Sequence, residues 1–137
     1  MMTTAAIQQE YKIDEPEKLS SYTDAPWKGI VFEDENIVIY EDGFPVTEGH
    51  LLFVPKRVER RLDITRCFEL AYEWGVQGVM DYRWEGFNVG INNGEVAGQS
   101  VMWPHVHMIP RRRGDTPNPK GGVRGVIPMN QEYDDKT

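Results

Sequence analysis

One stretch of this chain carries a hydrophobic period long enough for a long helix. Between residues 64 and 84, apolar or small residues recur at spacings of three and four, which places them on one helix face. These residues are Phe68, Ala71, Tyr72, Gly75, Val76 and Val79. Asp63 is the expected N-cap. Gly75 and Gly78 each weaken a helix by up to ~1 kcal/mol relative to alanine, so they mark close packing against a sheet.

Short strand-like runs surround this single helix. They are Gly29–Glu33, Ile37–Tyr40, His50–Pro55, Phe87–Asn92 and His105–Ile109. Turn-forming residues 34–36 separate the first two runs, which predicts a hairpin. Several strands in hairpin-like order with one long helix predict an α+β fold with a mainly antiparallel sheet.

The chain has the length of one compact domain, at 137 residues. Residues 1–26 are polar and without a sustained period, so we expect an N-terminal arm. The domain is expected to span residues 27–128, with a tail at 129–137. The segment from residue 111 onward is rich in glycine, proline and charge, which indicates an ordered loop or a wrapping arm.

Composition narrows the classes of partner. The net charge of −7 argues against nucleic acid, because that binding needs many phosphate-neutralising cations. A local positive site can still hold a small anion on an acidic protein. The single cysteine, Cys67, excludes an intramolecular disulfide or a cysteine-based zinc cluster. No apolar run approaches the ~20 residues of a membrane span, and no secretory leader is evident. We therefore expect a cytoplasmic protein without membrane contact.

The three histidines are the main candidates for chemistry. His105 and His107 alternate on one predicted strand, so both imidazoles project from the same face. The loop before them is rich in glycine and small polar residues, which can bring backbone N–H groups close to an anion. Its candidate ligands are Asn92, Gln99 and Ser100. A positive patch, Arg111–Arg113, follows the strand. Each feature alone has an ordinary structural explanation, but together they indicate an anion site.

Residues 98–111, GQSVMWPHVHMIPR, resemble the signature of the histidine-triad (HIT) superfamily, in which three histidines alternate with apolar residues. Residues 86–94 and 45–56 resemble two further segments of that family. Residues 113–119 and 121–128 are similar to bacterial-type members that act as dinucleoside polyphosphate hydrolases. The resemblance covers residues 27–128. One position departs from the signature: Trp103 replaces the first histidine of the triad and is followed by Pro104.

The resemblance implies an antiparallel sheet of about five strands with the long helix packed on it. It also implies a homodimer with a continuous sheet, consistent with an apolar helix that carries Trp74, Trp84 and two glycines. It implies a nucleotide hydrolase in which neutral His105 attacks the α-phosphorus, leaving a nucleotidyl-histidine that water hydrolyses. The second nitrogen of this ring would donate to the main-chain carbonyl at position 103, which a side-chain replacement does not remove.

The resemblance also assigns roles to neighbouring residues. His107 would donate a hydrogen bond to a phosphate oxygen in the transition state, and His50 would orient the strand from behind. Phosphate or ribose contacts would come from Asn92, Gln99, Ser100 and Asp42. Apolar residues for the base pocket would be Ile30, Phe32 and Ile39.

Three functions compete at this point. The first is a hydrolase of phosphoanhydrides or phosphoramidates of an adenosine- or guanosine-type nucleotide. It requires no cofactor beyond a divalent cation that the substrate phosphates carry in. The second is a nucleotide-binding module with little turnover, because Trp103 and Pro104 leave the triad incomplete. The third is a metal-dependent hydrolase with His50, His105 and His107 as ligands. Diadenosine polyphosphates, phosphoramidates and nucleotidyl sulfates share the adenylyl group, so the sequence does not choose among them.

Overall fold

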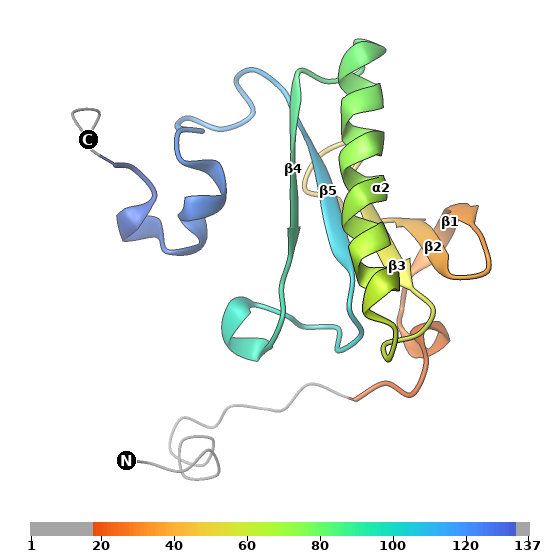
Figure 1. Cartoon of the computed structure of the whole chain (residues 1–137). Coiled ribbons are helices and arrows are strands. Elements are labelled where there is room, and N and C mark those ends of the chain that lie inside the picture. The colour runs from red at the N-terminus through yellow and green to blue at the C-terminus, as the bar shows by residue number, and fades with distance from the viewer. Residues whose placement is uncertain (1–17, 134–137) are drawn as a thin grey trace, which may run out of the picture.

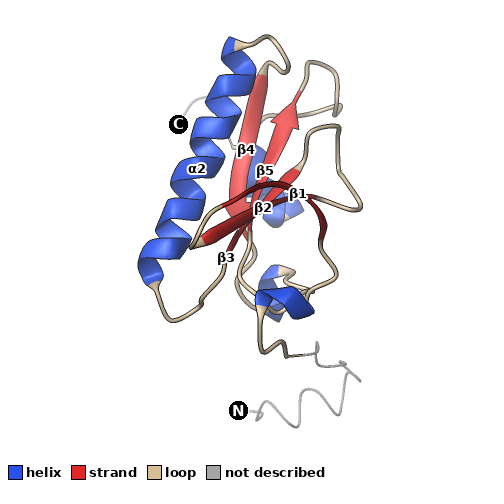
Figure 2. Ribbon diagram, turned by 90° about the vertical axis from the view of Figure 1, so that its right-hand side faces the viewer, coloured by secondary structure: helices blue, strands red, loops and turns tan. Residues whose placement is uncertain are grey.

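A computed structural model describes residues 18–133 of the chain. Its body is a five-stranded antiparallel sheet with one long helix, α2, packed on one face (Figures 1 and 2). The strands are β1 (Lys28–Glu33), β2 (Ile37–Glu41), β3 (Leu51–Pro55), β4 (Gly86–Ile91) and β5 (Val106–Arg111), and the helix is α2 (Arg61–Met80). Short 3-10 helices occupy Tyr22–Asp24 (η1), Glu95–Ala97 (η2), Gly122–Val126 (η3) and Pro128–Asn130 (η4). The predicted α+β class is confirmed, and most of the expected arm at 1–26 lies outside the described residues.

The order of the strands is β1-β2-β3-β5-β4, so β1 and β4 form the two edges. The predicted first hairpin is present. Asp34 stabilises its turn by accepting hydrogen bonds from the backbone N–H groups of Asn36 and Ile37, at 2.7 and 2.8 Å. β5 lies between β3 and β4 and pairs with β4 along its whole length, from Gly86↔Arg111 to Ile91↔Val106. The strand that carries the histidine pair is therefore held on both sides.

The ends of α2 differ from the prediction. Arg60 occupies the N-cap position, and Asp63 lies buried in the first turn. There its carboxylate lies 3.8 Å from the guanidinium nitrogens of Arg57 and Arg60. The helix ends at Met80, before Trp84, because the chain turns back there and the Trp84 indole donates to the Gly75 carbonyl at 2.9 Å.

Both helix glycines are closely packed, Gly75 against the sheet as predicted and Gly78 against Trp84 in the turn that follows the helix. A Cβ atom at Gly78 would overlap the Trp84 ring, and one at Gly75 would overlap the Phe87 ring. Alanine at either position would therefore force these aromatic rings away from the helix. Tyr72 was expected on the buried face, but it is exposed and lies with its ring 5.6 Å from that of Phe87.

The two faces of the sheet carry separate apolar clusters. Alternate strand residues pack beneath α2: Ile37, Ile39, Leu51, Phe53, Val106 and Met108. Cys67 of the helix is fully buried there, and burial raises the pKa of its thiol to about 12. The opposite face carries a second cluster: Val38, Tyr40, Leu52, Val54 and Trp103, covered by Leu19, Tyr22 and Trp27. β2 and β3 are therefore buried on both faces.

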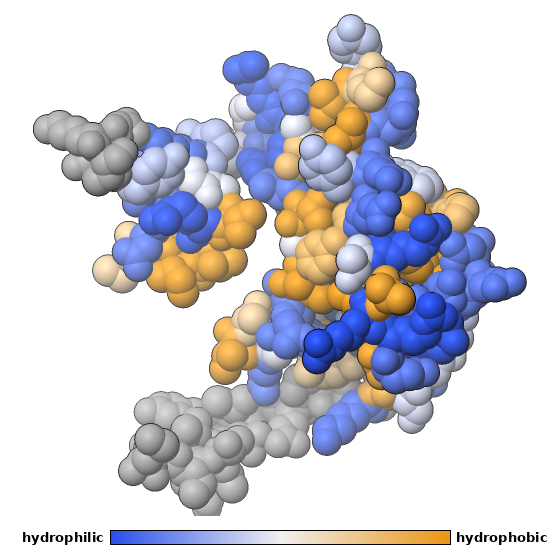
Figure 3. Space-filling model, in the orientation of Figure 1, coloured by the Kyte–Doolittle hydropathy of each residue, from blue (hydrophilic) through white to orange (hydrophobic). Residues whose placement is uncertain are grey.

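The C-terminal segment, residues 112–133, leaves the body after β5 (Figure 1). Its own polar contacts hold it together: the Arg124 guanidinium donates to the carbonyls of Asn130 and Gln131. Figure 3 shows apolar side chains gathered on this segment, which contacts the body through Arg112 and beside β4. The exposed ones are Val123, Val126, Ile127 and Met129. Of the helices in the described part of the chain, none has both the length and the apolar character needed to cross a lipid bilayer.

Candidate active site

His105 and His107 lie at the start of β5, in a cavity of about 550 Å³. His105 immediately precedes the strand, and His107 pairs with Leu52 of β3. Because paired residues share a face, His107 lies on the face opposite α2, where Leu52 packs. The cavity is lined by Pro26, Trp27, Lys28, Asp42, Gly43, Phe44, Leu52, Asn92, Gly98, Ser100, Val101, His105 and His107. It brings the predicted histidine pair together with three predicted polar residues, Asp42, Asn92 and Ser100.

The ring of His105 is oriented by a main-chain carbonyl. Its Nδ1 lies 2.7 Å from the carbonyl oxygen of Trp103. A carbonyl only accepts hydrogen bonds, so Nδ1 carries the proton and Nε2 keeps a lone pair. His105 is 8% exposed, and burial lowers its pKa below 6.5, although the Trp103 carbonyl and Asp42 act in the opposite direction. His105 is therefore a neutral imidazole at neutral pH, with a nucleophilic Nε2.

The tautomer of His107 follows from a second chain of hydrogen bonds. The backbone N–H of Val46 donates to Nδ1 of His50 at 3.1 Å, so the proton of His50 lies on Nε2. That N–H faces Nδ1 of His107 at 2.9 Å and a carboxylate oxygen of Asp42 at 3.3 Å. His107 therefore accepts at Nδ1 and carries its own proton on Nε2.

The Nε2–H group of His107 is left unpaired by the described residues. This nitrogen is buried and has no hydrogen-bond partner within residues 18–133. Burial, together with the neighbouring rings of His105 and His50, lowers the pKa of His107 to about 4. A buried donor without a partner costs free energy until an acceptor arrives, so this cavity wall is suited to an anionic oxygen.

The remaining loop residues divide into two groups. Asn92 and Ser100 line the cavity, as does Gly98, whose φ of 94° is in the left-handed region. Gln99 does not line it. Its amide oxygen accepts from the backbone N–H of Gly94 at 2.8 Å, and its amide nitrogen donates to the Val101 carbonyl at 3.0 Å. Gln99 therefore holds the loop in shape from within.

The apolar residues that the resemblance implied for a base pocket lie elsewhere. Ile39 is fully buried beneath α2, Phe32 lies beside Trp74, and Ile30 is exposed away from the cavity lining. The cavity instead presents Trp27 and Phe44. The Trp27 ring meets the His105 ring edge-on, with centroids 4.9 Å apart. Sequence reasoning missed Trp27 because the segment before it has no period; an aromatic residue just ahead of the first strand was the only signal.

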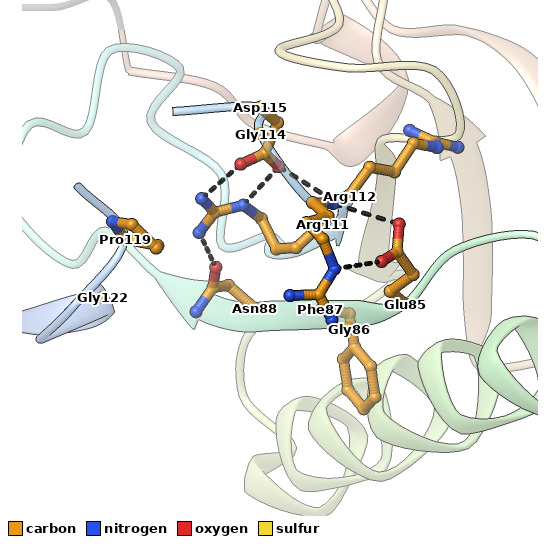
Figure 4. Close-up of a pocket in the computed structure, with 11 residues that line it drawn as sticks. Glu85, Gly86, Phe87, Asn88, Arg111, Arg112, Gly114, Asp115, Pro119 and Gly122 are labelled. Carbon is orange, nitrogen blue, oxygen red and sulfur yellow. Dashed lines mark hydrogen bonds and ion pairs between the residues drawn. The ribbon is translucent and has the colours of Figure 1, made fainter. Parts of the chain in front are cut away.

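The arginine patch does not face the histidines. It lies at the far end of β5, in a second cavity of about 390 Å³ shown in Figure 4. The Arg111 guanidinium binds both carboxylate oxygens of Asp115 and the amide oxygen of Asn88 (Figure 4). Arg113 pairs with Glu85 at 3.4 Å. These contacts neutralise much of the patch, so the interpretation of residues 111–113 as part of the histidine site is wrong.

The sequence offered His50, His105 and His107 as alternative metal ligands. Among the described residues, the set that brings ligand atoms within 4.8 Å of one another is Asp42, His50 and His107, without His105. A histidine that binds a metal normally donates its other ring N–H to an acceptor. His50 instead accepts a backbone N–H at that nitrogen, so its Nε2 carries a proton and has no lone pair to offer. The hydrogen bonding around His50 therefore does not suit a metal ligand.

Comparison with known proteins agrees with this geometry. A family model described as the HIT domain matches residues 27–114. An uncharacterised HIT-like protein of Methanocaldococcus jannaschii is 38% identical over 91 residues, 63% of this chain and 70% of that protein. A zinc-bound histidine triad family protein of Mycobacterium smegmatis has a similar structure (TM-score 0.61, 29% identity), covering 70% of this chain and 73% of that one. A HIT family protein of Bacillus subtilis is also similar (TM-score 0.55, 33% identity), covering 67% and 69%. The chain belongs to the histidine triad (HIT) family.

Proposed function

We propose that this protein hydrolyses a phosphoanhydride or phosphoramidate bond at the α-phosphorus of a nucleotide, through a nucleotidyl intermediate on His105. The observation that carries the proposal is the hydrogen bond from Nδ1 of His105 to the Trp103 carbonyl. It leaves a neutral, nucleophilic Nε2 in a residue that lines the cavity. The same observation favours the hydrolase over a binding module, because the acceptor required by the nucleophile is present despite Trp103 and Pro104.

The reaction has two steps. Nε2 of His105 forms a bond to the α-phosphorus, and the bond from phosphorus to the leaving oxygen or nitrogen breaks with its electron pair. The ring retains the Nδ1 proton, and the Trp103 carbonyl stabilises the positive charge that develops on it. Water then attacks phosphorus, the P–N bond to His105 breaks, and neutral His105 returns. The proton that the water releases to solvent balances the proton that the leaving oxygen or nitrogen takes up from solvent. The Nε2–H of His107 would donate to a non-bridging phosphate oxygen as charge redistributes.

The lining residues supply binding contacts for such a substrate. We assign Ser100 and Asn92 to the phosphates and Trp27 to stacking with the base. Asp42 is assigned to the ribose; its carboxylate already receives the backbone N–H of Phe44 at 2.8 Å. A purine nucleotide, of adenosine or guanosine type, suits the aromatic wall. No cofactor takes part, and a divalent cation enters only with the substrate phosphates.

The direct test is a substrate screen with intact-mass detection. Purified protein is incubated with an adenosine phosphoramidate, diadenosine polyphosphates and an adenylyl sulfate. We expect turnover of at least one substrate and, on rapid acid quench, a protein species heavier by one adenylyl group. Nucleotide binding without turnover or adduct would establish the binding-module function instead. Rapid turnover that is lost on chelation and restored by zinc would establish the metal-dependent function.

The pH dependence of the reaction should have an acid limb. Only neutral His105 attacks, so activity is present above its pKa and is lost as pH falls through that pKa. Because burial lowers this pKa, we expect the half-maximal point of kcat/KM below 6.5 and a flat profile between pH 7 and 8. The measurement is kcat/KM from pH 4 to 8 with a substrate whose chemical step limits the rate. A limb centred above 7 would contradict a neutral, buried nucleophile.

We also propose a homodimer formed through the β4 edge. β4 is an edge strand, so one side of its backbone has no strand partner within the described chain. The adjacent C-terminal segment exposes Val126 and Met129, and the neighbouring helix exposes Tyr72. A second copy pairing at β4 would extend the sheet and cover these apolar side chains. Analytical ultracentrifugation should give a dimer at micromolar concentration, and Met129→Glu should weaken it. A monomer at that concentration would contradict the proposal.

A further inference from the structure

Trp103 makes a hydrogen bond that extends the central sheet. Its indole is buried, and its Nε1–H donates to the carbonyl of Pro55 at 2.8 Å. The ladder between β3 and β5 ends at the pair Phe53↔Val106, so Pro55 lies beyond the last residue that β5 pairs. The indole N–H therefore takes the place of a strand partner for this carbonyl.

The main chain of the same residue holds the nucleophile. The Trp103 carbonyl accepts the Nδ1–H of His105, as described above. Pro104 lies between them, and its ring restricts the backbone to one φ. The peptide from Trp103 to Pro104 is thus anchored on one side through the indole to β3, and on the other by the start of β5. Trp103 is therefore held at both its side chain and its carbonyl.

The segment ahead of β1 packs on the apolar cluster that contains this indole. We call residues 18–27 the N-terminal strap. Leu19, Tyr22 and Trp27 of the strap pack on the apolar cluster that contains Trp103. Lys18 pairs with Met102, the neighbour of Trp103, in a parallel bridge. Trp27 then continues to the cavity and to the edge of the His105 ring. One wall of the cavity, at Trp27, is therefore joined to the apolar cluster of which Trp103 is a member.

We infer that Trp103 is a positioning residue: its indole N–H anchors the carbonyl that keeps the proton of His105 on Nδ1, and its ring supports the strap that carries Trp27. The effect on turnover rests on the proposed function, whereas the effect on the His105 tautomer does not. In this chain, the support at the first triad position therefore comes from the hydrogen bond between the Trp103 indole and the Pro55 carbonyl of β3.

The test compares two tryptophan variants. Trp103→Phe removes the N–H and keeps an apolar ring. Trp84→Phe is the matched control, because the buried Trp84 indole also donates to a carbonyl, that of Gly75 at 2.9 Å, on the helix side of the sheet. Long-range 1H–15N spectra of histidine-labelled protein report which ring nitrogen is protonated, with peaks assigned from single histidine variants. In the wild type we expect Nδ1–H at His105 and Nε2–H at His50 and His107.

In Trp103→Phe we expect a mixture of both tautomers at His105 and a kcat lower by about fivefold, or ~1 kcal/mol, with KM within twofold. Trp84→Phe should lower the melting temperature comparably and leave the His105 tautomer and kcat unchanged.

If Trp103→Phe does not fold, benzothienylalanine at position 103 keeps the bicyclic shape without the N–H. A strap variant, Tyr22→Ala, should raise KM and leave the tautomer unchanged.

The outcomes separate this inference from the proposed function. A wild-type His105 protonated on Nε2, or a Trp103→Phe protein with unchanged tautomer and kcat, would overturn the positioning role. A protein that turns over none of the substrates, yet shows the tautomer change in Trp103→Phe alone, would overturn the hydrolase proposal and leave the positioning role standing.

Discussion

His105→Ala should abolish turnover and leave nucleotide affinity within about tenfold of the wild type, or ~1.4 kcal/mol. The variant loses the attacking Nε2, while the other cavity contacts, including those of Ser100 and Trp27, remain. The measurements are kcat with the best substrate of the screen, the dissociation constant of a non-hydrolysable analogue, and intact mass after quench. No adenylylated species should form at any time point.

The result that contradicts this expectation is specific. A variant that keeps more than a few per cent of the wild-type rate would show that His105 is not the nucleophile. An adduct that still forms would place the nucleophile on another residue. Loss of binding together with loss of rate, at an unchanged melting temperature, would mean that the ring contributes mainly to affinity.

His107→Ala should lower kcat by about 10²–10³, or ~2.7–4 kcal/mol, the usual cost of losing one preorganised donor to transition-state charge. The wild-type Nε2–H is buried and without a partner in the described chain, so it is available before the substrate arrives. Unlike His105→Ala, this variant should still form the adenylylated intermediate, only slowly. Single-turnover rates with intact-mass detection separate the two variants.

A conservative replacement provides the control for His107. Glutamine retains an amide N–H donor and an amide oxygen that can receive the Nε2–H of His50, which in the alanine variant keeps only the more distant Asp42 carboxylate. His107→Gln should therefore recover part of the rate and most of the melting temperature. Equal rates for the alanine and glutamine variants, both within tenfold of the wild type, would show that His107 does not stabilise the transition state.

Much of the fold was predictable from local patterns. The continuous apolar runs of β2 and β3 reflect strands that are buried on both faces, and the helical period from Phe68 onward reflects one buried face; the structure contains the corresponding elements. The ends of α2 were not predictable, because they depend on contacts with distant groups. Trp84 leaves the helix to reach the Gly75 carbonyl, and Asp63 is drawn inward beside two arginines.

The site shows the same division. The histidine pair and the small polar loop residues could be grouped because they are close in sequence and carry a recognisable spacing. Closeness in sequence gave the wrong expectation for Arg111, which was grouped with the histidine site. It is six residues from His105, but it lies at the other end of an extended strand, in which each residue advances the chain by roughly 3.3 Å. Closeness in sequence also gave no indication of Trp27, because its contact with His105 depends on how the strap crosses the sheet.

The burial of Cys67 determines how its thiol responds to oxidants and alkylating reagents. Burial raises the pKa of this thiol to about 12, so the thiol form dominates at neutral pH. Oxidants and alkylating reagents attack the thiolate, and this side chain lies under α2, away from the nitrogen nucleophile. The single thiol of the chain is therefore unreactive, and thiol oxidation or alkylation should leave the proposed hydrolysis unchanged.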